Sequence, residues 1–222
     1  MLYLYQKNAG ISQLSLEGDE HRYIFKVRRH KVDDTLFLRN LEDGLLHRYL
    51  ITSIDKRSVL LVLQESKYLE IGAKQPLHIG WCVIDPKSIE KVLPSLNEIG
   101  VEKITFIYCK RSQTSFKLDF KRLKKILLNS SQQSGRSKMM DLNTSESLEI
   151  FLKEYPDANM LNFSKNNFIS KNDINTIIIG CEGGFTEDEV ALFKAENIIG
   201  FDTPLVLKSE SAVCAVAAKI LL

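Results

Sequence analysis

Hydrophobic and β-branched residues in the first part of the chain form short runs that are separated by turn residues and show no helical period. One clear turn signal is Asp43-Gly44, a dipeptide that favours a tight hairpin between two such runs. Several strands at short spacing predict a small β-barrel or curled sheet, which we place at residues 1–70. The runs that predict its strands are residues 23–27, 35–38, 45–54 and 59–63.

After residue 71 the pattern changes to buried strands that alternate with amphipathic helices, which is typical of an α/β domain. Residues 77–84 predict a buried strand, and Asp85-Pro86 supplies an N-cap and an N1 proline for the helix that follows. We therefore expect a second domain at residues 71–222. Its further elements are strands at residues 103–109, 159–163, 176–179 and 198–201, and helices at residues 117–134, 187–195 and from Ser211 onwards.

The charged residues are divided unevenly between the two parts of the chain. Residues 1–140 hold 24 Lys and Arg against 15 Asp and Glu, a net charge of +9, whereas residues 141–222 hold 6 against 13, a net charge of −7. Residues 21–32 contain five arginines and lysines and no acidic residue. This basic stretch predicts contacts with the phosphates of a nucleic acid. A solvated but uneven charge distribution is the alternative.

Cysteine usage and the chain ends point to an intracellular protein. The four cysteines at 82, 109, 181 and 214 form no CxxC pair and have no histidine at metal-ligand spacing, so we expect neither a disulfide framework nor a metal site. The N-terminus lacks the pattern of a signal peptide, and the apolar residues 212–222 are too few to span a bilayer. We expect a cytoplasmic location in a reducing compartment and no membrane partner.

Residues 176–190 carry the strongest local signal for chemistry. A buried strand runs into a glycine-rich turn and then into a helix that Thr186 and Glu189 are expected to cap. Gly183 and Gly184 permit a positive φ and allow a ligand to approach the backbone closely. The segment therefore predicts a cofactor loop, although glycines also serve plain turns.

Charge at this loop indicates what kind of cofactor it would hold. Four acidic residues crowd the helix N-terminus, where a phosphate-binding loop would leave room for an anion: Glu182, Glu187, Asp188 and Glu189. The glycine spacing also differs from the dinucleotide and triphosphate fingerprints, which argues against an oxidoreductase. A cationic or zwitterionic cofactor fits better, such as the sulfonium of S-adenosylmethionine. Acidic first turns also stabilise helices by themselves.

Two segments of this chain resemble the ribosomal RNA small subunit methyltransferase E family. Residues 179–185 are Ile-Gly-Cys-Glu-Gly-Gly-Phe and residues 205–212 are Leu-Val-Leu-Lys-Ser-Glu-Ser-Ala. The family has approximately I-G-P-E-G-G-F and R-I-L-R-T-E-T-A at these places. Further matches at residues 21–34, 98–101, 111–112 and 133–136 extend the resemblance over nearly the whole chain.

The resemblance implies a PUA-like RNA-binding β-barrel domain joined to a SPOUT-type methyltransferase domain, an α/β fold with a C-terminal trefoil knot that works as a homodimer. Periodicity alone could not suggest a knot, because knotted folds are rare. The implied cofactor is S-adenosyl-L-methionine, and the implied partner is 16S ribosomal RNA or the small ribosomal subunit. The implied reaction is methylation of N3 of one uridine, and it requires no metal.

Site residues follow from the same resemblance. Arg136 and Lys208 are expected to stabilise negative charge on the uracil carbonyls, and Glu210 to orient one of them or accept the N3 proton. A purely structural place in the first turn of the last helix is the alternative for Glu210. Cofactor contacts are expected from Gly180, Glu182, Gly183, Gly184, Thr203, Leu205, Val206 and Leu207. The distribution of basic residues, rather than the resemblance, predicts the RNA contacts, which are expected from Arg22, Lys26, Arg28, Arg29, Lys31, Arg111 and Arg136.

The sequence departs from the family pattern at four places near these segments. Cys181 replaces a proline, Thr203 a glycine, and Leu205 and Lys208 two arginines. Lys208 keeps the positive charge but loses the planar fork of a guanidinium. Two alternatives therefore stay open: a SPOUT enzyme that acts on another RNA position, and an RNA-binding assembly factor that no longer holds the cofactor.

Overall fold

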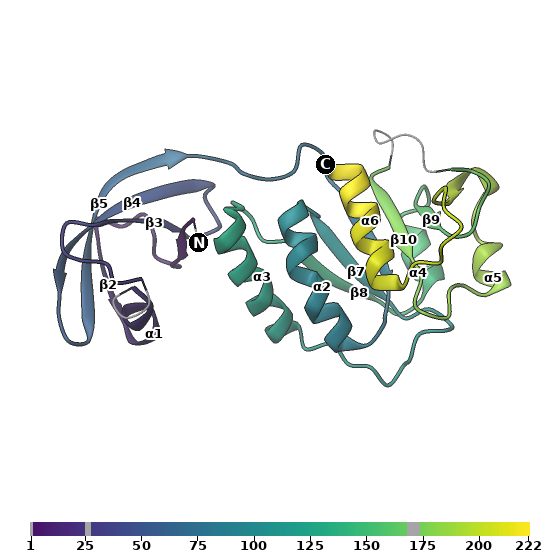
Figure 1. Cartoon of the computed structure of the whole chain (residues 1–222), viewed down its shortest axis with the longest axis horizontal. Helices are drawn as coiled ribbons and strands as arrows, with labels where there is room; N and C mark the ends of the chain where they lie inside the picture. Colours follow the sequence, from purple (N-terminus) through teal and green to yellow (C-terminus); the bar gives the residue numbers. More distant parts are fainter. Residues whose placement is uncertain (1, 25–27, 168–173) are drawn as a thin grey trace. The chain divides into compact units, whose positions relative to one another are not determined.

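The structure is a computed structural model that describes residues 2–24, 28–167 and 174–222. The chain divides into two compact units, and each is described by itself (Figure 1). The first unit comprises Met1–Gly72 and residues 128–139, and the second comprises residues 73–127 and 140–222. Residues 128–139 belong to the first unit because Gln132 accepts hydrogen bonds from the backbone N–H groups of Leu2 and Tyr5.

Within the described residues, the first unit is built on a five-stranded sheet in the order β1-β3-β4-β5-β2. Strand β1 pairs in parallel with β3, and the other pairs are antiparallel. Two register shifts between β4 and β5 bend and twist the sheet, which closes around Leu16, Tyr49 and Leu61. The elements are β1 (Leu4–Tyr5), β2 (Gln13–Glu17), α1 (Gly18–Arg22), β3 (Thr35–Arg39), β4 (Leu45–Ile54) and β5 (Ser58–Tyr68).

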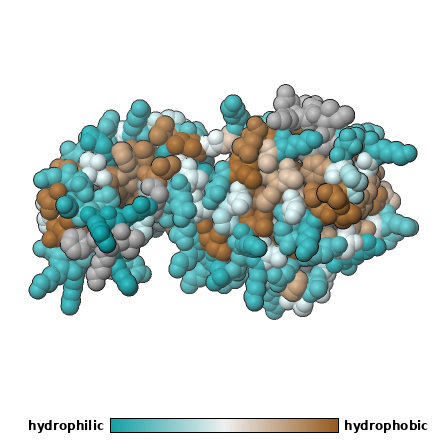
Figure 2. Space-filling view, in the orientation of Figure 1, coloured by the Kyte–Doolittle hydropathy of each residue, from teal (hydrophilic) through white to brown (hydrophobic). Residues whose placement is uncertain are grey.

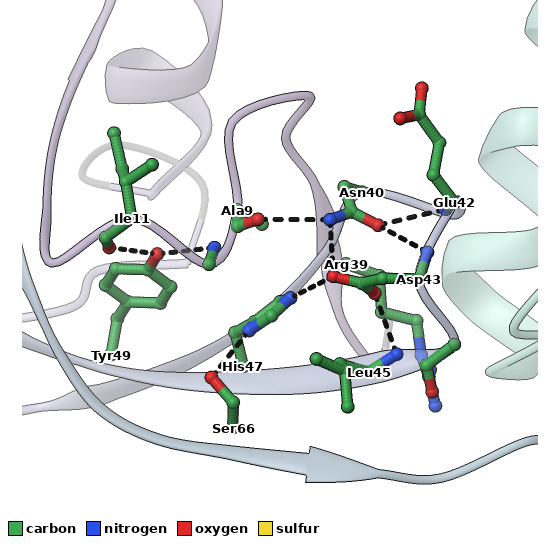
Figure 3. A network of polar contacts seen from close by, with 12 residues as sticks. Ala9, Ile11, Arg39, Asn40, Glu42, Asp43, Leu45, His47, Tyr49 and Ser66 are labelled. Atoms are coloured by element: carbon green, nitrogen blue, oxygen red, sulfur yellow. Dashed lines mark hydrogen bonds and ion pairs between the residues drawn. The ribbon is translucent and has the colours of Figure 1, made fainter.

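The predicted turn at Asp43-Gly44 joins β3 to β4, and a polar network holds it (Figure 3). His47 is 1% exposed, and its ring contacts Asp43 through Nε2 at 3.1 Å and the Ser66 hydroxyl through Nδ1 at 2.9 Å. The Tyr49 hydroxyl donates to the Ile11 carbonyl at 2.7 Å. The network thus ties the turn and the loop before β2 to the curled sheet.

One predicted strand of the first unit was wrong where the structure describes it. Residues 23–27 have strand-type side chains, yet Tyr23 has helical dihedral angles and ends α1, while residues 25–27 lie outside the described residues. Ile24 packs into the core of the sheet with Leu16 and Leu38. Tertiary packing has therefore overridden local β-propensity at this place.

Within the described residues, the second unit has a six-stranded parallel sheet in the order β11-β9-β10-β6-β7-β8. Strands β10 and β6 are neighbours, and the chain leaves them toward opposite edges of the sheet, since β11 lies on one side of the pair and β7 on the other. Open α/β sheets bind ligands at such switch points. The strands are β6 (His78–Cys82), β7 (Lys103–Ile107), β8 (Asp141–Ser145), β9 (Asn159–Leu161), β10 (Thr176–Ile179) and β11 (Ile198–Ile199). Its helices are α2 (Pro86–Ile99), α4 (Leu148–Glu154), α5 (Glu187–Val190), a 3₁₀ helix (Ala195–Asn197) and α6 (Ser209–Leu221). Helix α3 (Phe120–Ser134) is divided between the units, with residues 120–127 in the second and residues 128–134 in the first.

Helices α6 and α4 cover opposite faces of this sheet. The Trp81 indole contacts Ser209 of α6, whereas a side chain at Gly80 would meet Phe151 of α4 at 3.1 Å. Successive strand residues point to opposite faces, so the two helices lie on different sides. The predicted start of α2 is confirmed, because the Asp85 carboxylate accepts from the Ser88 N–H and Pro86 follows at N1.

The cysteine spacing predicted no disulfide framework, but the structure contains one bonded pair of cysteines. Cys82 and Cys109 are joined by a disulfide bond, with their Cα atoms 5.7 Å apart. Cys82 ends β6 and Cys109 follows β7, and these two strands are parallel neighbours. Their separation of 27 positions in the sequence hides this proximity, which only the strand pairing reveals.

Three further expectations concern the whole fold. No helix among the described residues has the length and apolar character needed to cross a bilayer. The same residues contain no group of three or more potential His, Cys, Asp or Glu metal ligands. The trefoil knot stays a prediction, because strand order does not define how the chain is threaded.

Candidate functional site

A cavity of about 240 Å³ opens at the carboxyl ends of β9 and β10 and is bounded by the segment that leads into α6. Strand β10 also forms one side of the point between β10 and β6 at which the strand connections diverge. All eight residues that the sequence predicts as cofactor contacts line it: Gly180, Glu182, Gly183, Gly184, Thr203, Leu205, Val206 and Leu207. The fold therefore brings together two segments that are about twenty residues apart in the sequence.

Other residues of the cavity wall were missed by sequence reasoning. They come mainly from the end of β9 and from the start of α6, and include Leu161, Asn162, Phe163, Ser209 and Ala212. The β9 residues carry no motif, and only the pairing of β9 with β10 places them here. Ser209 and Ala212 follow closely after the predicted cofactor segment at residues 203–207. The expected start of the last helix was therefore the sequence feature that could have identified them.

The glycine-rich loop is shaped by one left-handed residue and by a capped helix. Gly184 has a φ of 66°, a conformation that glycine adopts without strain, and its N–H donates to the Cys181 carbonyl at 2.9 Å. Helix α5 then begins with the predicted capping box. The Thr186 hydroxyl accepts from the Glu189 N–H, and the Glu189 carboxylate accepts from the Thr186 N–H.

Glu189 also fixes the loop after β7 against the glycine-rich loop. Its side chain is 1% exposed, and its second oxygen accepts from the Lys110 backbone N–H at 2.8 Å. The next residue, Arg111, donates through Nη1 to the Gly183 carbonyl at 2.6 Å. Lys110 Nζ also pairs with Asp188 at 2.9 Å, which lowers the pKa of that carboxyl. The cavity wall is therefore held by a second loop that carries a predicted RNA contact.

A hydrogen-bonded chain anchors the start of α6 to the same loop. The Trp81 Nε1–H donates to the Ser209 hydroxyl at 2.9 Å, and this hydroxyl donates to the Gly180 carbonyl at 2.6 Å. The next residue is Glu210, whose Oε2 atom is buried without a hydrogen-bond partner in the described part of the chain. A buried polar atom in this condition is uncommon and calls for a functional explanation.

The electrostatics of the cavity favour a cation over an anion. Glu182, Glu187 and Asp188 are exposed on the loop and the first turn of α5, so a phosphate at this helix N-terminus would meet like charge. Cys181 lies in the wall, and burial raises the pKa of its thiol, which keeps the sulfur neutral. These residues fit a positively charged or zwitterionic ligand.

The residues predicted to contact RNA fall in both units. Arg22, Arg28, Arg29 and Lys31 are exposed on the first unit, Arg111 is exposed on the second, and Lys26 lies outside the described residues.

Arg136 belongs to the first unit and is 8% exposed, with its Nε donating to the Lys138 carbonyl at 3.3 Å. Lys208 and Glu210 belong to the second unit, where Lys208 is exposed at the N-cap of α6. The predicted catalytic residues therefore fall into two separately described groups.

Comparison with known families matches both parts of the chain. Residues 72–221 match the family described as RNA methyltransferase domain, and residues 16–64 match the RNA methyltransferase PUA domain. Ribosomal RNA small subunit methyltransferase E of Helicobacter pylori is 38% identical over 222 residues, which cover 98% of each chain. The protein of the same name from Rickettsia conorii is 26% identical and covers 97% of this chain and 93% of its own.

Solved structures share the fold at low sequence identity. A probable rRNA-methyltransferase from Porphyromonas gingivalis superposes with a TM-score of 0.84 at 19% identity, covering 100% of this chain and 98% of its own. Ribosomal RNA small subunit methyltransferase E from Neisseria gonorrhoeae, bound to S-adenosyl methionine, has a TM-score of 0.80 at 17% identity. That similarity covers 98% of this chain and 95% of the other.

Proposed function

The chain belongs to the ribosomal RNA small subunit methyltransferase E family, and on this premise we propose that it methylates N3 of a uridine in 16S ribosomal RNA with S-adenosylmethionine as donor. Membership makes it an rRNA methyltransferase. The fold expected from the resemblance is confirmed: a PUA-like curled sheet and a parallel-sheet, SPOUT-like domain. The assignment of the methyl group to N3 of uridine goes beyond family membership and is our proposal.

One observation carries the assignment of the cofactor site: the cavity collects both segments that the resemblance predicts. At Gly184 a Cβ atom would meet no heavy atom within 4 Å, so this backbone faces open space rather than core. A ligand can therefore approach the chain directly at the glycine-rich loop. The acidic surroundings and the neutral wall at Cys181 suit the cationic sulfonium, and a relative of the same fold binds S-adenosyl methionine.

When bound, S-adenosylmethionine supplies an electrophilic methyl group, and the protein has to present a nucleophile in line with it. Uridine N3 carries a proton at neutral pH, so a base must remove it. Glu210 has a buried carboxylate oxygen without a described partner, and we assign it the role of accepting that proton. Lys208, exposed two residues before it at the N-cap of α6, would stabilise the negative charge that develops on a uracil carbonyl.

Arg136 is the third residue of the proposed catalytic set, after Glu210 and Lys208. The side chain is largely buried in the first unit, and the Tyr3 hydroxyl donates to its backbone carbonyl at 2.7 Å. We retain it in the proposed set as a cation that would stabilise negative charge on a uracil carbonyl.

We also propose that the enzyme works as a homodimer in the cytoplasm, where the small ribosomal subunit is its substrate. Large apolar side chains at the cavity mouth are strongly exposed in the single chain: Phe163 at 81%, Leu205 at 73% and Val206 at 76%. Figure 2 shows hydrophobic surface on the second unit over the segment that leads into α6. Contiguous exposed apolar surface of this kind is typical of an interaction site, and a second copy would cover it.

The reaction can be tested by mass spectrometry of nucleosides. The protein is incubated with 16S ribosomal RNA, or with small subunits that lack the modification, and with isotopically labelled S-adenosylmethionine. We expect labelled 3-methyluridine in the reaction that contains the preferred substrate, whether that is free 16S ribosomal RNA or the small subunit. A labelled 2′-O-methyl nucleoside, or label in transfer RNA alone, would replace the proposed position by another RNA target. Absence of label with intact binding of RNA would favour an assembly factor.

A further inference from the structure

The first unit contains a pocket of about 340 Å³, within the range of roughly 300–1,000 Å³ that is common for small-ligand sites. Its floor is formed by Tyr3 and Ile24, which are 3% and 2% exposed. Its rim includes Leu2 and Phe37, which are 61% and 41% exposed. The pocket therefore combines a packed apolar base with apolar side chains that are open to solvent.

Polar side chains on the pocket wall are held in place. Arg28 Nε donates to the Tyr23 hydroxyl at 2.8 Å, and the guanidinium carbon lies 5.7 Å from the centre of the Tyr23 ring. Close by along the chain, the His30 ring contacts Asp34 through Nδ1 at 3.2 Å, and Asp34 also accepts from the Lys31 N–H. This contact orients His30 so that its other ring nitrogen, Nε2, can meet a polar ligand.

Aromatic rings and guanidinium planes are the surfaces on which proteins stack unpaired nucleobases, and side chains such as histidine meet base edges. The pocket offers all three kinds of group through Phe37, Tyr23, Arg28 and His30. It also lies within the basic stretch of the first unit, where Arg28, Arg29 and Lys31 are exposed. A backbone bound by these charges would place bases next to the pocket mouth.

We propose that this pocket binds one unpaired base of the RNA substrate and thereby distinguishes single-stranded from double-stranded RNA. The inference rests on the proposed function, because it presupposes that RNA is the ligand of the first unit. It adds a base-binding site to a surface for which charge alone predicts only phosphate contacts. A duplex keeps its bases paired and stacked, so it can use the phosphate contacts but not the pocket.

The test compares the affinity of the full chain for a single-stranded RNA of about ten nucleotides and for a duplex of the same length. The variant is Phe37→Ala, which removes an exposed ring from the rim. Stacking on aromatic side chains is lost on such truncation, so binding of the single strand is expected to weaken roughly tenfold. Binding of the duplex, and the slope of log affinity against log salt, should stay as in the wild type, because no phosphate contact changes.

Two control variants are compared with Phe37→Ala in the same binding measurements. Leu60→Ala truncates another exposed apolar residue of the same sheet, on β5, and should leave both affinities unchanged. Arg29→Glu reverses an exposed charge in the basic stretch, and should weaken both RNAs and reduce the salt slope by about one or more.

Equal loss for both RNAs in Phe37→Ala, or wild-type affinity for the single strand, would overturn the base pocket while leaving the methyltransferase assignment intact. Thermal unfolding of Phe37→Ala at the wild-type temperature shows that the variant is folded. Failure of the wild-type chain to bind either RNA would overturn this inference, whereas the proposed function is decided separately by the methyl-transfer assay.

Discussion

Replacing Gly184 by valine is expected to weaken binding of S-adenosylmethionine by more than about 100-fold, or roughly 2.7 kcal/mol. Gly184 lines the cavity and has a φ of 66°, and the left-handed region costs an ordinary residue about 1–2 kcal/mol and a β-branched one more. A side chain at this position would also project into the space that the ligand needs, since a Cβ there meets no atom within 4 Å. Calorimetric titration of the folded variant with the donor measures the effect.

The chain offers a closely matched control for this variant. Gly18 in the first unit has a φ of 60°, and its Cβ would likewise meet no atom within 4 Å. Gly18→Val therefore introduces the same backbone strain away from the cavity, and should lower the unfolding temperature without changing the affinity for the donor. If Gly184→Val is folded and binds within about twofold of the wild type, the glycine-rich loop is not the seat of the cofactor.

Replacing Glu210 by glutamine is expected to lower kcat by about 100-fold or more, which is the scale of a positioned general base. Glutamine keeps the size and hydrogen-bonding capacity of the side chain but cannot take up the N3 proton. Binding of S-adenosylmethionine should be unchanged, because Glu210 itself is not among the residues that line the cavity. The measurement is the rate of methyl transfer at saturating donor and RNA, together with the calorimetric affinity for the donor.

A structural role for Glu210 in the first turn of α6 would give a different result. In that case Glu210→Gln would lower the unfolding temperature, and kcat would stay within about threefold of the wild type once the protein is folded. Glu149→Gln is the matched control, since Glu149 is an exposed carboxylate in the first turn of α4 and does not line the cavity. It should change neither quantity. A large loss of kcat in both variants would point to a general effect of removing a carboxylate rather than to a base at Glu210.

Features that depend on a few neighbouring residues could be predicted from the sequence. Strand β4, the N-cap at Asp85, the turn at Asp43-Gly44 and the capping box of Thr186 and Glu189 all match the structure. In each case the signal is local: alternating burial, a side chain that satisfies free N–H groups, or a dipeptide suited to a tight turn. The two segments that line the cavity were also located, because glycines and the resemblance marked them.

Features that depend on distant pairing could not be predicted in this way. The contribution of Phe163 to the cavity follows from the place of β9 beside β10, and the Cys82–Cys109 disulfide follows from the pairing of β6 with β7. Strand β8 and helix α4 were missed because polar residues fill the exposed edge strand and the helix spans only seven residues. The buried contacts of Glu189 with Lys110 equally required the folded chain.

A crystal structure of the protein with S-adenosylmethionine tests the central claim most directly, that the cavity beside the glycine-rich loop is the methyl-donor site. The account predicts the donor against the backbone of residues 180–184 and 203–207, with its methyl group turned toward the cavity mouth near Lys208 and Glu210. Density for the donor at another place, or an empty cavity in crystals grown at a saturating concentration of the donor, would contradict it.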